Sequence, residues 1–162
     1  MIAIAAGRAE TLTFRRAKLY LVSGVLIAGN VLAPVMLHQI GSTGRVLLPI
    51  YFFSLVAGLR YGWRCGLITA LVSPLLSFWL TAMPARPIIG WVIVKSIMLG
   101  VVGGLAAGKL KNLTLTALVA VVTTQMVAGL MGNFADIVVG YPGLALQILM
   151  APVVARLSLD ES

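Results

Sequence analysis

The strongest constraint on this chain is that its charged residues lie almost entirely between long apolar runs. Only 10% of its 162 residues are charged, while 60% are hydrophobic and the mean hydropathy is +1.07. A soluble domain of this length needs about a quarter of its residues charged, so lipid must cover the surface instead. The composition therefore predicts a single all-α integral membrane domain surrounded by the lipid bilayer.

A helix needs about 20 apolar residues to cross the hydrocarbon core of a membrane. On that basis, charges, prolines and glycines divide the chain into six predicted membrane helices, at about 19–40, 46–59, 63–83, 88–110, 113–135 and 137–157. The second segment is short, because Arg45 and Arg60 enclose only about 14 residues, or about 21 Å of helix. It either crosses with both arginines extended to the interfaces or re-enters on one side.

The basic residues favour a crossing second segment. With six membrane helices and both termini cytoplasmic, one side carries nine basic residues and the other carries only Arg45 and Arg86. Since cytoplasmic loops are enriched in Lys and Arg, this asymmetry supports six helices in the inner membrane. It also explains the net charge of +8 without a nucleic-acid partner. The predicted cytoplasmic set is Arg8, Arg15, Arg16, Lys18, Arg60, Arg64, Lys109, Lys111 and Arg156.

Several polar residues fall inside the predicted membrane helices. Lys95 lies about seven residues inside the fourth, where an ionised group costs several kcal/mol unless it faces a polar cavity or a partner. Reaching the interface would require about 11 Å, so a position facing a polar cavity is favoured over extension to the interface. Gln125, Asn133 and Asp136 follow one another along the fifth predicted helix, and Gln147 lies within the sixth. We expect these residues to line the same interior as Lys95.

Small residues recur along the first predicted helix, in Gly24-x-x-x-Ala28 and Gly29-x-x-x-Ala33. This spacing lets a second helix approach closely, either within the fold or from a partner protein. Asn30, on the same helix, could line the interior with Lys95. For each buried amide, a hydrogen bond between helices is the structural alternative.

The chain shows no pattern typical of an enzyme. Asp136 is the only acidic residue outside the tails, and no nucleophile lies beside a base. One cysteine and one histidine do not make a metal site, and no cofactor is expected. Residues 103–110, GGLAAGKL, nearly match a phosphate-binding loop, but Leu110 replaces the hydroxyl that binds magnesium. We interpret these glycines as helix-packing residues, so an ATP-driven step would need an ATPase on another chain.

Three stretches resemble the substrate-binding S components of energy-coupling factor (ECF) vitamin transporters. LLPIYFFSLVAGLRYGWRCGL at 47–67 and SPLLSFWLTAMP at 73–84 are similar to the second and third helices of that family. YPG at 141–143, followed by 144–157, is similar to its sixth helix. The resemblance implies capture of a vitamin or vitamin precursor from outside, with inward release driven by a membrane coupling protein and two ABC ATPases. The residues implied to face the coupling protein are Gly24, Ala28, Gly29 and Ala33.

These inferences predict an outward-facing substrate site among helices four to six, closed by loops 41–45 and 83–87. Excess positive charge there favours a carboxylate-bearing ligand, whereas internal pairing of Lys95 with Asp136 would suit an uncharged one. The alternatives are a self-contained oligomeric channel or carrier and a non-transport assembly subunit. The expected site residues are Lys95, Arg45, Gln125, Asn133, Asp136 and Gln147.

Overall fold

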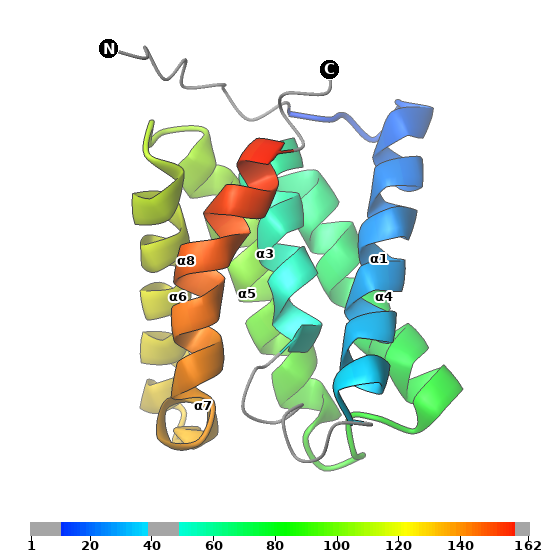
Figure 1. Ribbon diagram of the computed structural model, residues 1–162, viewed down its shortest axis with the longest axis vertical. Coiled ribbons are helices and arrows are strands. Elements are labelled where there is room, and N and C mark those ends of the chain that lie inside the picture. Colours follow the sequence, from blue (N-terminus) through cyan, green and yellow to red (C-terminus); the bar gives the residue numbers. More distant parts are fainter. Residues whose placement is uncertain (1–10, 39–48, 158–162) are drawn as a thin grey trace.

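The computed structural model of the protein describes residues 11–38 and 49–157, and these ranges contain seven helices and no strand. The helices form a bundle, with the short α7 at one end (Figure 1). By length and composition, α1, α4, α5 and α6 can each cross a membrane, while α3 and α8 are apolar but shorter. The chain is therefore a multi-pass helical membrane protein. Its helices are α1 (Ala17–His38), α3 (Pro49–Tyr61), α4 (Trp63–Thr81), α5 (Ile89–Ala107), α6 (Leu113–Leu130), α7 (Ala135–Val138) and α8 (Tyr141–Leu157).

The main departure from the predicted segments lies between α6 and α8. The chain leaves α6 in a Schellman turn, in which Asn133 N donates to Ala128 O at 2.8 Å and Gly132 N donates to Gly129 O at 2.9 Å. Gly132 has a φ of 80°, which glycine adopts without a steric penalty. The prediction that Asn133 and Asp136 continue the fifth helix is therefore wrong, as are its end at 135 and the start of the sixth at 137. Asp136 lies on the separate helix α7.

The short second segment becomes the central helix of the bundle. α3 has 13 residues and packs against α1, α4, α5, α6 and α8. Its side chains Leu55, Val56, Ala57 and Leu59 are at most 2% exposed. Because neighbouring helices cover α3, its length does not have to match the thickness of the lipid.

Glycines allow α3, α4 and α5 to pack with their backbones in contact. Gly62 alone separates α3 from α4, and its φ of 85° suits the sharp turn. A β-carbon added to Gly66 would overlap the carbonyl of Gly100, and one added to Gly104 would overlap the backbone of Trp63. The interpretation of the 103–110 motif as a helix-packing element is confirmed for Gly104.

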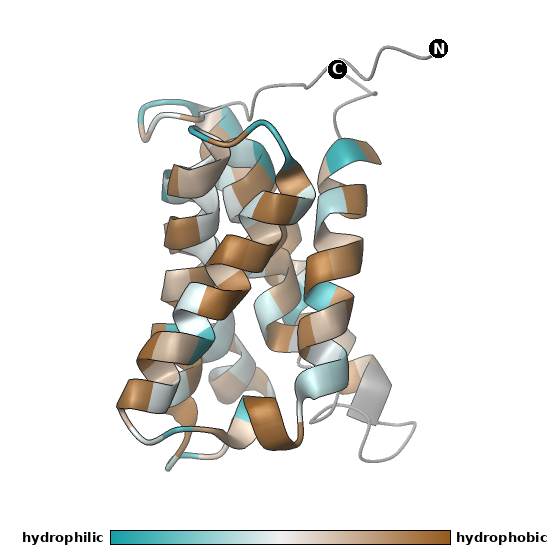
Figure 2. Cartoon of the chain, turned by 90° about the vertical axis from the view of Figure 1, so that its left-hand side faces the viewer, coloured by the Kyte–Doolittle hydropathy of each residue, from teal (hydrophilic) through white to brown (hydrophobic). Residues whose placement is uncertain are grey.

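The surface separates apolar sides from a basic end. Hydrophobic residues cover the helix surfaces (Figure 2), with Leu21, Trp79 and Leu130 between 72% and 88% exposed. The start of α1, the α3–α4 turn, the α5–α6 connection and the end of α8 meet at one end of the bundle (Figure 1). Arg86 lies in the α4–α5 connection at the other end. The described basic residues of the first end are Arg15, Arg16, Lys18, Arg60, Arg64, Lys109, Lys111 and Arg156.

Candidate functional site

A buried ion pair lies near the end of the bundle opposite the basic residues. Lys95 Nζ donates hydrogen bonds to Asn133 Oδ1 and Asp136 Oδ2, each at 2.9 Å. Lys95 is 2% exposed and Asp136 is 8% exposed. Lys95 is therefore buried and paired inside the bundle and does not extend to the interface. The internal pairing with Asp136, one of the two alternatives for its charge, is the one observed.

Local sequence explains how these three side chains meet. Val92, Lys95 and Leu99 recur at three- and four-residue spacing, which places them on one buried face of α5. The turn after α6 reverses the chain, so that Asn133 and the first turn of α7 return toward this face. The periodicity of α5 therefore positions Lys95 on the buried face, whereas the turn after α6 positions Asn133 and Asp136 beside it.

Two buried glutamines have side-chain atoms without hydrogen-bond partners among the described residues. Gln147 on α8 is fully buried, and neither its Oε1 nor its Nε2 has a partner. Gln125 on α6 is 7% exposed, and its Oε1 has none. A buried polar group left unpaired costs about 1–3 kcal/mol. These three amide atoms therefore retain unused hydrogen-bonding capacity.

Helix geometry places the glutamines in the same layer as the ion pair. Lys95 comes six residues after the start of α5, Gln147 six residues after the start of α8, and Gln125 five residues before the end of α6. Those three helix ends lie together (Figure 1), so each residue is about 7 to 9 Å from the same end. α6 packs against α5 and α8, and α3 packs against all three. Hereafter, the polar cluster means Lys95, Gln125, Asn133, Asp136 and Gln147.

The proposed closing loops are only partly described. Arg45 and loop 41–45 lie outside the described residues. Loop 83–87 joins α4 to α5 at the end of the bundle near the polar cluster, and Arg86 is exposed there.

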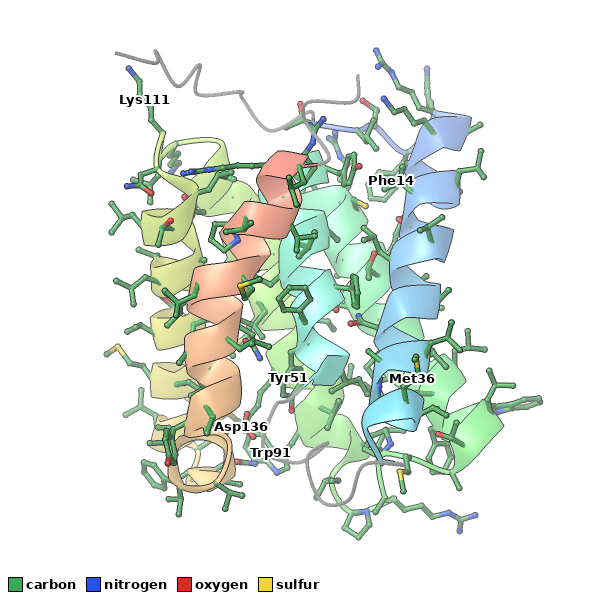
Figure 3. All side chains as sticks on the ribbon, viewed as in Figure 1. Phe14, Met36, Tyr51, Trp91, Lys111 and Asp136 are labelled. Atoms are coloured by element: carbon green, nitrogen blue, oxygen red, sulfur yellow. The ribbon has the colours of Figure 1, made fainter. Side chains whose placement is uncertain are left out.

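Tyr51 is a site candidate that the sequence analysis did not single out. It lies near the start of α3, is 4% exposed, and is close enough to Asp136 for an electrostatic interaction. Figure 3 shows Tyr51, Trp91 and Asp136 in the same part of the bundle. The sequence feature that could have identified Tyr51 is its phenol, two residues after Pro49 in an otherwise apolar run. A buried tyrosine hydroxyl usually needs a polar partner.

Asn30 forms hydrogen bonds between helices, the structural alternative to lining the site. Its Nδ2 donates to Ser54 Oγ at 2.9 Å and to Ser73 Oγ at 3.0 Å, and its Oδ1 accepts from the backbone N of Phe53 at 3.1 Å. These bonds connect α1 with α3 and α4. Asn30 therefore does not line the interior with Lys95, because its hydrogen-bonding groups are used in helix packing, the reading favoured for each amide taken singly.

The small residues of α1 divide between two faces. Gly24 and Ala28 are exposed, and a β-carbon added to Gly24 would meet nothing within 4 Å. In contrast, a β-carbon added to Gly29 would lie 3.0 Å from the ring of Phe53 on α3. Because successive residues are rotated by about 100°, Gly29 and the partly buried Ala33 turn toward the bundle. Only Gly24 and Ala28 remain available to a partner protein.

The described residues contain no group of three or more His, Cys, Asp or Glu side chains that could hold a metal ion. The polar cluster therefore combines a neutralised buried pair with unpaired amide atoms on two neighbouring helices. A comparison of the chain with models of known protein families, with curated proteins and with solved structures found no match.

Proposed function

We propose that this chain is the substrate-capture (S) subunit of an ECF-type importer for a vitamin or vitamin precursor. The observation that carries the proposal is the polar cluster, where a buried ion pair, the unpaired amide of Gln147 and the unpaired Oε1 of Gln125 lie at a similar depth in an apolar bundle. Polar and ionisable groups inside a membrane are expensive and usually serve binding or transport. The cluster is the substrate site.

The charge asymmetry supports an outward-facing site. Cytoplasmic segments are enriched in Lys and Arg, so the end that contains Arg64, Lys109 and Lys111 is cytoplasmic. The polar cluster lies toward the opposite end, where a ligand arrives from outside the cell. Both ends of the chain are then cytoplasmic, and the protein resides in the bacterial inner membrane.

The packing role of Gly104 supports energy supply by other chains. Gly104 packs against the backbone of the α3–α4 turn, and the nucleotide is bound by two partner ABC ATPases. The membrane coupling protein contacts the exposed face of α1 around Gly24 and Ala28, where small side chains permit close helix approach.

Co-purification tests this assignment. An affinity-tagged chain extracted from its native membrane is expected to elute with a membrane coupling protein and an ATPase pair. ATP-independent flux of a solute through the chain alone, reconstituted in liposomes, would establish the channel or carrier alternative. A chain that binds neither ATPases nor a small molecule identifiable by mass spectrometry would be an assembly subunit.

The two glycines of α1 provide a matched test of the partner face. Gly24→Leu adds a side chain into open space and is expected to preserve folding while abolishing co-elution of the ATPases. Gly29→Leu meets the Phe53 ring and is expected to lower thermal stability. Normal ATPase co-elution with Gly24→Leu would exclude this face as the contact.

A further inference from the structure

We propose that the polar cluster binds an uncharged molecule that presents an amide-like edge, with a hydrogen-bond donor beside an acceptor, to Gln147. The ligand class includes carboxamides, lactams, cyclic ureas and imides. This inference rests on the proposed capture function, because it names the ligand chemistry of the same site.

The charges within the polar cluster are already paired. Lys95 is neutralised by Asp136 at 2.9 Å and also donates to Asn133. A carboxylate entering this layer would lose its hydration and approach the Asp136 carboxylate, while the nearby cation is already paired. Arg86, at the same end, is exposed in the loop between α4 and α5. The structure therefore removes the main reason for expecting a carboxylate-bearing ligand.

The two glutamines of the polar cluster retain unused hydrogen-bonding capacity. Gln147 is fully buried, and both its acceptor Oε1 and its donor Nε2 lack partners among the described residues. The complement of a carboxamide is another amide edge, which forms two antiparallel hydrogen bonds with it. Gln125 Oε1, on the adjacent helix α6, can accept one further N–H group. A neutral ligand with an N–H beside a C=O satisfies both amide atoms of Gln147, and a second N–H satisfies Gln125 Oε1.

Another buried amide in the same bundle, Asn30, provides a comparison for Gln147. Asn30 carries the same functional group and is also fully buried, yet its amide makes three hydrogen bonds. The fold can therefore satisfy a buried amide where packing requires it. Gln147 has been left unpaired at the level of the ion pair, which is the pattern expected of a binding residue.

Ligand-induced stabilisation tests the proposal with defined probes. The purified chain in detergent is heated with nicotinamide or nicotinate, and with uracil or orotate, at saturating concentrations. Within each pair the uncharged member is expected to raise the unfolding temperature, while the acid has a smaller effect. Equal or greater stabilisation by either acid, or no stabilisation by any probe, would overturn the proposal.

Two leucine substitutions of buried amides separate binding from folding. Gln147→Leu removes two unpaired polar atoms, so the free protein is expected to be as stable as wild type or more stable. Its affinity for the uncharged probe should fall about 10-fold or more, as expected for two lost hydrogen bonds. Asn30→Leu breaks satisfied bonds and should lower stability while preserving probe affinity. The reverse assignment of these two effects would show that Gln147 is a structural residue.

The proposed function and the ligand chemistry can fail independently. If the chain elutes with an ATPase pair but responds to the acids, only the ligand class is wrong. If it responds to the uncharged probes but transports without ATPases, the amide site stands and the importer assignment fails. Mass spectrometry of molecules extracted from wild type and Gln147→Leu gives a second readout, since a neutral amide compound should be depleted in the variant.

Discussion

Lys95 and Asp136 illustrate how a charge is held inside this bundle. The ammonium and carboxylate lie 2.9 Å apart, and Asn133 provides a second acceptor for the ammonium. Removing ions from water costs several kcal/mol each, and this cost is offset only when the pair is well placed and hydrogen-bonded. Each member is therefore required mainly because its partner would otherwise be buried and unpaired.

Single and double substitutions test this relationship. Lys95→Met or Asp136→Leu alone is expected to reduce the free energy of unfolding by about 3 to 5 kcal/mol. The double variant should regain most of that loss, because neither charge remains uncompensated. Detergent-induced unfolding followed by circular dichroism measures all three. If the double variant is as unstable as the less stable single variant, loss of the ion-pair partner does not explain the destabilisation.

At the scale of helices, close backbone approach organises the core. α5 packs against both α3 and α4, and glycines occupy the positions where the helices meet. Interiors are close-packed, so even one added methyl group must displace a neighbour. The same packing surrounds α3 and permits a 13-residue helix to serve as the centre of the bundle.

Two glycines of α5 test the packing of this helix. The β-carbon of Gly100→Ala would lie 2.6 Å from the carbonyl oxygen of Gly66, so this variant should lose about 1 to 3 kcal/mol of stability. Gly90→Ala is the matched control, because its β-carbon meets nothing within 4 Å, and its stability should stay the same or rise slightly. Thermal unfolding in micelles compares them. Equal stability of the two variants would show that α4 and α5 are packed less closely than described.

At the scale of the whole molecule, apolar sides and unequal ends define how the protein sits in a membrane. Trp79 and Leu130 are 88% and 87% exposed, which is costly in water but favourable against lipid. The two ends differ in basic charge, and this difference determines the proposed orientation.

Cysteine labelling in intact cells measures that orientation. Cys65 is buried, so the native background with a membrane-impermeant maleimide should be low. Arg86→Cys is expected to react from outside, whereas Lys111→Cys should react only after the membrane is permeabilised. The opposite result would invert the molecule and place the polar cluster toward the cytoplasm.

Properties that depend on local composition and periodicity could be predicted from the amino-acid sequence. Apolar length predicted the helical membrane class and most helix boundaries within three residues, and depth within its segment predicted that Lys95 does not extend to the interface. The contacts between side chains could not be predicted in this way, because they join residues far apart in the chain and depend on how the helices pack. Lys95 and Asp136 are 41 positions apart, and they meet because a turn at Gly132 ends α6 early. Packing likewise left Gln147 unpaired while it satisfied Asn30, since a side chain's type sets its hydrogen-bonding capacity and the surrounding helices set its partners.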